Sequence, residues 1–371
     1  MLDHDNFGVW YFMKRHLILE DGTVFEGLGF GAPATTFGEI IFHTAMTGYQ
    51  EIITDPIYDG QMIVFAMPVI GAAGIHAEAY ESVKPAIRGM IVHDLAEVSV
   101  NRQRRMNLDR FLKQHNIPGL YQVDTRKLIR HLRETGPQKA TIVDFADDHA
   151  VDQLVATVLT NKQVQNTATL KPYANPGRGR HIVVIDFGLK HGILRMLGDY
   201  DANVSVLPYT TSVDEVLTLD PDGIILSTGP GDPRSLPDSV LTLIRVLQTK
   251  APLLGIGLGH ELFALANDAT LAPLSSEHHG MNHPIQEIIS RQIFFAMQGQ
   301  GYAVDNDSID RKKLFVTYRD LVDGAVQGLR HREYPAFSVQ FFPDAAPGPL
   351  EATAVFADFF ETVEDYVEHH S

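Results

Sequence analysis

The sequence predicts an α/β protein of two domains, a mixed α+β domain followed by an open, mostly parallel sheet with helices on both faces. The length of 371 residues exceeds the roughly 150 residues of a typical single domain. Residues 171–180 combine prolines, glycines and basic side chains, a composition typical of a linker. After this segment, strand-like and helix-like runs alternate, which favours parallel strands joined by helices. We therefore expect domains over residues 13–170 and 181–371, with residues 1–12 as a tail.

The composition excludes several classes of protein. The formal net charge of −16 argues against nucleic-acid binding, which needs basic patches to meet phosphates. The chain has no cysteine, so disulfides, thiolate metal sites and thiol nucleophiles are all excluded. No run approaches the ~20 apolar residues that span a membrane, and the N-terminus lacks the basic start of a signal peptide. We expect a cytoplasmic protein that makes no membrane contact.

The first domain is expected to mix short strands with two helices. Asn107 is suited to cap one helix, and Asp124 to cap a second helix that ends before Gly136. The stretch from Met46 to Pro56 predicts a turn followed by a strand that closes on an Asp-Pro pair. Short β-like runs predict further strands over residues 16–20, 23–25, 39–43, 62–67 and 87–92.

The second domain is expected to gather its functional loops at one edge of its sheet. In open parallel sheets, sites form at the carboxyl ends of the strands. Three loops follow such ends, over residues 187–188, 228–233 and 257–259. Alternating runs predict strands over residues 181–186, 204–208, 223–227 and 253–256, and helices over residues 189–197, 239–249 and 261–266.

The stretch around Gly257 has the pattern of a nucleophile elbow. An apolar run, Leu253 to Ile256, enters a glycine-rich turn, and a helical run follows it. Such a turn raises one side chain beside the N-terminus of a helix. At this position the chain has glycine, which has no side chain to react. The neighbouring Gly229 and Gly231 loop is suited to present backbone N–H groups to an oxyanion, although a plain tight turn explains that loop alone equally well.

These features together resemble a known family. Residues 19–27 with residues 46–56 resemble the N-terminal domain of the carbamoyl-phosphate synthetase small subunit. The elbow with the Gly-Pro-Gly-Asp-Pro loop resembles a class I glutamine amidotransferase domain, and the resemblance spans roughly residue 14 to the C-terminus. It implies that the chain packs on a large synthetase subunit, that ATP and magnesium bind only there, and that this chain holds no cofactor. It also implies the release of ammonia from glutamine for carbamoyl phosphate synthesis, which feeds arginine and pyrimidine pathways.

The chain departs from the family pattern at the three triad positions. In the family a cysteine attacks the glutamine amide, a histidine acts as base and acid, and a glutamate orients the histidine. Matching the motifs Gly-Ile-Cys-Leu-Gly-His-Gln and Gln-Gly-His-Pro-Glu-Ala places Gly257, Phe342 and Asp344 at these positions. We expect all three to be inert. Glycine relieves the strain of the elbow, and Phe341 with Phe342 is expected to fill and seal the cleft.

The family's glutamine-binding positions are altered as well. Ala45 stands where the family has serine, and Glu261 places a charge where a neutral amide would contact glutamine. Residues 298–302 read Gln-Gly-Gln-Gly-Tyr instead of Gln-Asn-His-Gly-Tyr, so glutamine binding is doubtful. The substrate positions implied by the resemblance are Ala45, Gly229, Gly231, Leu258, Glu261, Gly299, Gly301 and Tyr302.

Other side chains offer alternative chemistry. Ser227, Ser275 and Ser276 lie in the second half, but none follows an elbow motif. Three histidines invite a zinc interpretation, yet their segment also matches an ordinary family segment, so we expect no metal. These histidines are His278, His279 and His283.

Two functions remain open from the sequence. The first is a scaffold without glutaminase activity, bound to the large subunit in a complex that uses free ammonia. The second is a stand-alone binding or regulatory protein that uses the old cleft.

Overall fold

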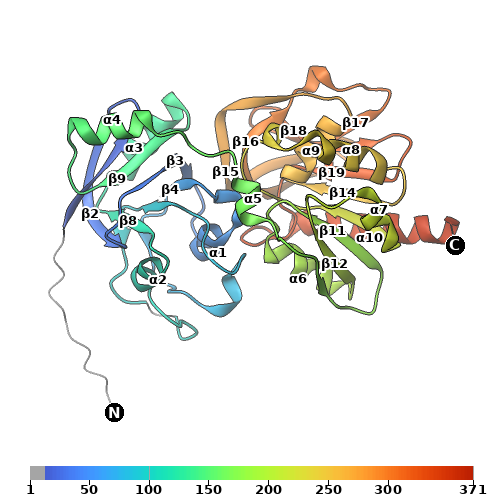
Figure 1. The fold of residues 1–371 in the computed structure, drawn as a ribbon, viewed down its shortest axis with the longest axis horizontal. Helices are drawn as coiled ribbons and strands as arrows, with labels where there is room; N and C mark the ends of the chain where they lie inside the picture. The colour runs from blue at the N-terminus through green and yellow to red at the C-terminus, as the bar shows by residue number, and fades with distance from the viewer. Residues whose placement is uncertain (1–12, 100, 371) are drawn as a thin grey trace, which may run out of the picture.

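The computed structural model describes residues 13–99 and 101–370 and shows two domains side by side (Figure 1). The predicted tail, residues 1–12, lies outside the described residues. Among the residues described, no helix combines the length and apolar character needed to cross a bilayer.

The first domain is built on a closed barrel of seven strands in the order β1-β2-β8-β6-β4-β3-β9. Closure pairs every strand on both sides, so the barrel has no free edge. Alternate residues of β4 face opposite sides: Met62 and Val64 pack in one apolar cluster, Ile63 and Phe65 in another. The bounds are β1 (Lys14–Leu19), β2 (Val24–Gly31), β3 (Thr36–His43), β4 (Gln61–Phe65), β6 (Gly89–Ile91), β8 (Pro118–Tyr121) and β9 (Gln138–Val143). A separate pair comprises β5 (Val69–Ile70) and β7 (Asp94–Leu95).

The two predicted helices of this domain are confirmed with their caps. The side chain of Asn107 accepts a hydrogen bond from the Arg110 N–H at the start of α2 (Leu108–Gln114). The side chain of Asp124 does the same for Lys127 at the start of α3 (Thr125–Thr135). A further helix, α4 (Asp148–Ala156), follows β9.

The strand expected between Met46 and Pro56 is wrong, because Tyr49–Thr54 forms the helix α1. Tyr49, Ile52 and Ile53 are buried together at helical spacing, and the adjacent β-branched pair imitates a strand in the sequence. The carboxylate of Asp55 then accepts a hydrogen bond from the Ile57 N–H and caps the next turn. The segment therefore ends on a buried acid at the boundary between the domains.

The second domain is a ten-stranded sheet in the order β10-β12-β11-β13-β14-β19-β18-β16-β15-β17. The five strands from β12 to β19 in this order are parallel, as predicted, whereas the other half is antiparallel and was not predicted. The bounds of the parallel strands are β11 (His181–Asp186), β12 (Asn203–Pro208), β13 (Gly223–Leu226), β14 (Leu253–Ile256) and β19 (Ala336–Val339). Those of the antiparallel extension are β15 (Leu271–Glu287), β16 (Ile293–Val304), β17 (Leu314–Asp320) and β18 (Val326–His331).

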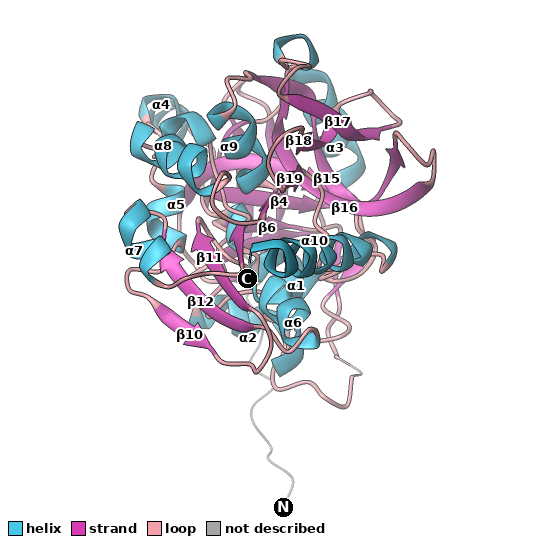
Figure 2. Ribbon diagram, turned by 90° about the vertical axis from the view of Figure 1, so that its right-hand side faces the viewer, coloured by secondary structure: helices cyan, strands magenta, loops and turns pink. Residues whose placement is uncertain are grey.

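Helices cover both faces of this sheet, which confirms the predicted layering (Figure 2). One apolar cluster joins the sheet to α7, α8 and α9, and the opposite cluster joins it to α6 and α10. The bounds are α6 (His191–Asp199), α7 (Val213–Thr218), α8 (Asp238–Leu247), α9 (Leu258–Ala266) and α10 (Ala354–His370).

The segment expected as a linker, residues 171–180, contributes a strand to the second domain. Within it, β10 (Tyr173–Asn175) pairs antiparallel with β12 at the edge of the sheet. Just before it, α5 (Gln163–Thr167) inserts Val164 into an apolar cluster of the second domain. Packing with the second sheet thus begins several residues before the expected boundary.

Candidate functional site

The elbow at Gly257 has the predicted geometry of strand, sharp turn and helix. Gly257 lies between β14 and α9 with φ of 57° and ψ of −113°. A residue with a Cβ is strained in this left-handed region, so glycine removes a cost of about 1–3 kcal/mol. The turn keeps the shape of a nucleophile elbow and lacks the nucleophile.

Close packing fixes where α9 begins. A Cβ added to Gly259 would lie 2.3 Å from the carbonyl oxygen of Leu226 on β13, so only glycine fits. The helix can therefore start at Leu258 and lie directly against the strand. This contact holds the turn at the carboxyl edge of the sheet.

Phe342 occupies the position predicted for the base, and its ring crowds the elbow. Its Cε1 atom would be 3.1 Å from a Cβ on Gly257, and the Cγ2 atom of Thr228 would be 3.3 Å from it. The phenylalanine is 3% exposed and packs with Ile57 of the first domain and Met297 of the second. A hydrocarbon ring has no atom that can accept a proton, so this position cannot act as a general base.

Phe341 does not fill the cleft, contrary to the expectation from sequence. Its side chain points to the opposite side and packs edge-on against Phe294 and Tyr318, with ring centroids 5.5 and 5.4 Å away. The two neighbouring side chains lie in different apolar clusters, Phe341 in the cluster that joins the second sheet to α6 and α10, and Phe342 in the cluster with Ile57 and Met297.

Asp344, at the position of the orienting acid, pairs with a buried lysine. Its Oδ2 atom lies 3.1 Å from Nζ of Lys190, which is also 3.2 Å from Oδ2 of Asp55. Lys190 further donates a hydrogen bond to the carbonyl oxygen of Ala346. Burial alone lowers the pKa of Lys190, but the charges of Asp344 and Asp55 outweigh it and raise that pKa above its usual value. Asp344 thus stabilises a cation where the family pattern would orient a histidine.

A cavity of about 380 Å³ lies between the domains beside the elbow. The expectation of a sealed site is therefore wrong, since Phe342 forms one wall and leaves the rest of the cavity open. Of the eight predicted substrate positions, seven line it: Gly229, Gly231, Leu258, Glu261, Gly299, Gly301 and Tyr302.

Ala45 is the predicted position that the structure does not place on the cavity wall. It is 4% exposed and lies in the apolar cluster that contains Ile57 and Phe342. Ala45 is therefore part of the apolar core next to the cavity wall.

Glu261 is buried, and the negative charge expected there from the sequence is largely absent at neutral pH. Gln340 donates a hydrogen bond from Nε2 to Oε1 of Glu261 over 3.1 Å. Burial raises the pKa of Glu261 to about 8, so the group is mainly protonated at neutral pH. A neutral carboxylic acid offers both a donor and an acceptor, as a primary amide does, although the amide has a second N–H. The change from glutamine is thus smaller than expected.

Several polar residues on the cavity wall were missed by sequence reasoning. Nε2 of Gln300 and Oε1 of Gln340 are buried and make no hydrogen bond within the protein. On the first-domain side, Glu39 accepts a hydrogen bond from Gln61, and burial together with the charge of Glu277 raises the pKa of Glu39. No motif marks Glu39 or Gln61, because they come from a barrel that is brought to the site only by the contact between domains.

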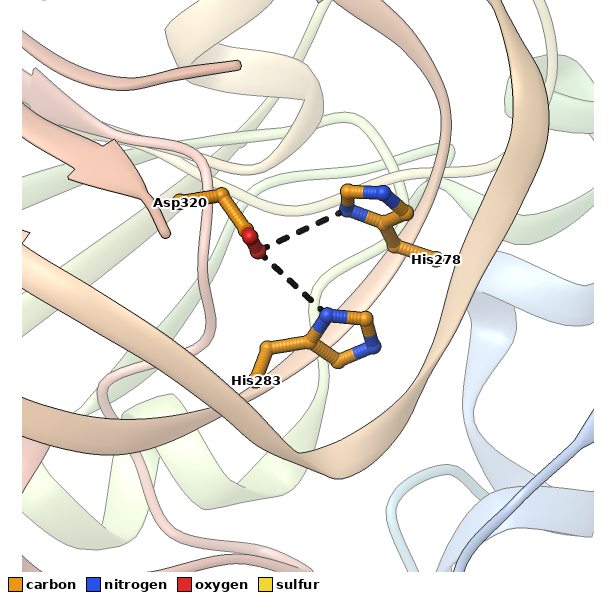
Figure 3. Close-up of side chains that lie close together, drawn as sticks. All are labelled: His278, His283 and Asp320. Atoms are coloured by element: carbon orange, nitrogen blue, oxygen red, sulfur yellow. Dashed lines mark ion pairs between the residues drawn. The ribbon is translucent and has the colours of Figure 1, made fainter. Parts of the chain in front are cut away.

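The fold places the three histidines singled out in the sequence at two different points, and it buries Ser227. His279 lies on the cavity wall and contacts Glu277, whereas His278 and His283 point toward Asp320 (Figure 3). Oγ of Ser227 is buried, accepting a hydrogen bond from the Phe187 N–H and donating one to the carbonyl oxygen of Thr228. It therefore has no histidine to activate it.

Comparison with known proteins matches both domains. The family model for the carbamoyl-phosphate synthase small chain, CPSase domain, covers residues 17–142. The model for glutamine amidotransferase class-I covers residues 183–362. The chain belongs to the carbamoyl-phosphate synthase small-chain family. This membership confirms the family and the two-domain fold class predicted from the motifs.

Relatives in this family align along nearly the whole chain. The carbamoyl phosphate synthase pyrimidine-specific small chain of Lactiplantibacillus plantarum is 47% identical over 94% of this chain and 96% of its own length. The carbamoyl phosphate synthase small chain of Streptococcus mutans is 46% identical over 95% of this chain and 98% of its own. The carbamoyl phosphate synthase small chain of Bacillus thuringiensis is 44% identical over 95% of this chain and 97% of its own length. Gly257, Phe342 and Asp344, the positions matched to the triad motifs, therefore lie inside a chain that aligns with these relatives over nearly its whole length.

Proposed function

We propose that this chain is a carbamoyl-phosphate synthase small subunit that no longer hydrolyses glutamine and acts as the scaffold of a complex that uses free ammonia. The observation that carries the proposal is the pair formed by Gly257 and Phe342. Amide hydrolysis by this route needs a nucleophile and a proton acceptor that face each other. At these two positions the chain has a hydrogen atom and a benzene ring.

The partner in this proposal is the large synthetase subunit, which binds ATP and magnesium. This chain then needs no cofactor of its own. Carbamoyl phosphate made in the complex would serve arginine or pyrimidine synthesis. The first domain supports a docking role because its barrel is intact and its buried residues pack in continuous apolar clusters.

An exposed apolar surface on the second domain gives docking a further basis. It lies on the β15–β16 hairpin and on the turn after β17, where the Leu321 N–H binds the Pro284 carbonyl oxygen. Ile289 is 76% exposed and Val322 72%, and contiguous exposed apolar groups commonly mark interaction sites. The apolar residues of this surface are Ile288, Ile289, Ile293, Phe295, Leu321 and Val322.

Co-purification with the large subunit tests the proposal. The two chains are expected to elute together, and the complex to form carbamoyl phosphate from ammonium but not from glutamine. The double variant Ile289→Asp/Phe295→Asp is expected to weaken association, whereas Leu350→Asp, at an exposed leucine outside this surface, serves as the matched control. The absence of association at micromolar concentrations, or ammonia release from glutamine at rates typical of an active glutaminase, would overturn it.

A second function, in a different class, is favoured by the open cavity. A stand-alone binding or regulatory protein would use its unpaired Gln300 and Gln340 atoms and the neutral Glu261 to hold a small amino acid or a related amide. Thermal unfolding with glutamine, ammonium and related amino acids separates the two functions, because a ligand that binds the folded state raises the melting temperature. Stabilisation of the isolated chain together with failure to bind the large subunit supports this second function.

A further inference from the structure

A cluster of two histidines and one aspartate lies outside the cavity wall. His278 and His283 come from β15, and Asp320 is the last residue of β17 (Figure 3). The potential ligand atoms of these three side chains, which all belong to the described part of the chain, lie within 4.8 Å of one another. The pairing of β15 with β17 thus brings Asp320 close to two histidines that lie at least 37 positions earlier in the chain.

The spacing of the three atoms suits a small metal ion. Oδ2 of Asp320 lies 3.3 Å from Nδ1 of His283 and 3.7 Å from Nδ1 of His278. In a tetrahedral zinc site, bonds of about 2.0–2.2 Å place the ligand atoms roughly 3.3–3.5 Å apart. The two imidazole rings stack with centroids 4.7 Å apart and an interplanar angle of 24°, so both nitrogens face the same carboxylate.

Both ring nitrogens of His278 have polar partners in the metal-free protein. Its Nε2 atom lies 3.0 Å from a carboxylate oxygen of Asp323, which places a proton on that nitrogen. Nδ1 of the same ring lies 2.6 Å from Oε1 of Gln298, whose Nε2 donates to Asp320 and so fixes the orientation of the amide. At 2.6 Å this contact is a hydrogen bond with a proton between the two atoms, so a zinc ion on Nδ1 would replace that proton and require Oε1 of Gln298 to move away, because two zinc ligands lie at least about 3.3 Å apart.

The second histidine has an unsatisfied nitrogen at the same point. Nδ1 of His283 is buried and makes no hydrogen bond within the protein, although it faces Asp320. The contact between His278 and Asp323 is the arrangement in which a carboxylate orients a histidine that binds a metal through its other nitrogen. The unpartnered nitrogen of His283 and the carboxylate of Asp320 thus meet at one point, and Nδ1 of His278 joins them when zinc replaces its proton.

We propose that His278, His283 and Asp320 bind one zinc ion, with Asp323 orienting His278. Imidazole and carboxylate donors in a set of three are typical of zinc, and the fourth position is open to water or to the carbonyl oxygen of Gln298. The ion joins β15 to the turn after β17. The family segment led the sequence analysis to expect no metal. The sequence marks the two histidines but not Asp320, which lies far from both along the chain.

Zinc titration of the full chain tests this site. The protein is stripped with a chelator and titrated with Zn²⁺ by calorimetry, and Co²⁺ is used as a second probe because tetrahedral coordination gives it a visible absorption. All proteins carry His369→Gln and His370→Gln, which removes the histidine pair at the C-terminus as a stray site. We expect one zinc per chain and a Co²⁺ spectrum typical of tetrahedral nitrogen and oxygen ligands.

Variants distinguish this site from adventitious binding. His283→Gln and Asp320→Asn are each expected to abolish the binding event, and Asp323→Asn to weaken it about 10–100-fold. Since Asp323 is 37% exposed, its variant is expected to fold even if the two ligand variants do not. His149→Gln, at an exposed histidine on α4, is the matched control and should bind zinc as the parent does. Equal zinc affinity in the parent, His283→Gln and Asp323→Asn, or no binding by the parent at about 0.1 mM, would overturn the proposal.

Discussion

The ammonium of Lys190 lies 3.1 Å from the carboxylate of Asp344, and the two side chains are buried to 0% and 1% exposure. Asp55 from the first domain contacts the same ammonium at 3.2 Å, so the ion pair connects the two domains. Burial raises the pKa of Asp55 to about 6 and also raises that of Asp344, although the charge of Lys190 opposes both shifts. A position that the family pattern gives to catalysis here serves the contact between domains.

Lys190→Met is expected to destabilise the protein by about 3–5 kcal/mol, because it leaves two buried carboxylates without a counter-charge. Asp344→Asn should cost less, about 1–3 kcal/mol, since Asp55 and the Ala346 carbonyl oxygen still bind the ammonium. Urea unfolding followed by circular dichroism measures both changes. Lys250→Met, at an exposed lysine, is the control and should stay within about 0.5 kcal/mol of the parent. Equal losses for the Lys190 and Lys250 variants would contradict the network.

Glu261→Gln is expected to remove part of the pH dependence of stability. In the folded protein the carboxyl keeps its proton up to a pKa of about 8, against a usual value of 4.5. The native state therefore binds more protons than the unfolded state between these values, and its stability falls as pH rises through this range. The variant should be more stable than the parent at pH 7.5, by on the order of 3–4 kcal/mol, and nearly equal to it at pH 4.5.

Urea unfolding at several pH values measures this difference. Glu368→Gln, at an exposed glutamate on α10, provides a control in which the pH dependence should not change. If the parent and the Glu261→Gln variant lose stability in parallel between pH 5 and 8, Glu261 is ionised in the folded state and the neutral-acid interpretation of the cavity is wrong.

Gly259→Ala is expected to destabilise strongly, by at least about 3 kcal/mol, because its Cβ would overlap the Leu226 carbonyl oxygen at 2.3 Å. Gly198→Ala is the matched control on another helix. A Cβ there meets no atom within 4 Å, so alanine should stabilise the protein by about 0.5–1 kcal/mol through its higher helix propensity. Thermal unfolding tests whether the melting temperature falls for Gly259→Ala and rises for Gly198→Ala. A small decrease for Gly259→Ala would show that α9 can move away from β13.

The sequence could predict local elements better than their assembly. The caps at Asn107 and Asp124 act within three residues, so their helices follow from local chemistry. The elbow at Gly257 could be predicted for the same reason, since strand, turn and helix are contiguous. Three features depend on contacts between distant segments, which a local sequence pattern does not predict. They are the closure of the barrel, the antiparallel half of the second sheet and the Glu39 wall of the cavity. The pairing of Asp344 with Lys190 belongs to the same class, because the acid was assigned from a motif and its partner lies 154 positions earlier.

Gly257→Cys alone is expected to release no ammonia from glutamine. The new side chain would start 3.1 Å from the Phe342 ring and 3.3 Å from Thr228, in a strained backbone conformation, and no base would take its proton. We expect a loss of stability of about 1–3 kcal/mol and no activity above background. Ammonia release is measured with the large subunit present, and a single variant that hydrolyses glutamine would contradict the inert site.

The double variant Gly257→Cys/Phe342→His replaces both missing groups and is the first combination expected to show chemistry. Because the chain has no cysteine of its own, alkylation by iodoacetamide reports on the introduced thiol alone. An imidazole in place of the Phe342 ring should lower the pKa of that thiol, so the double variant should be alkylated at lower pH than the single one. Asp344 stays paired with Lys190, so the new histidine lacks its orienting acid, and hydrolysis should remain well below that of an intact triad. Identical alkylation profiles for the two variants would mean that position 342 does not face the elbow in the way its ring contacts indicate.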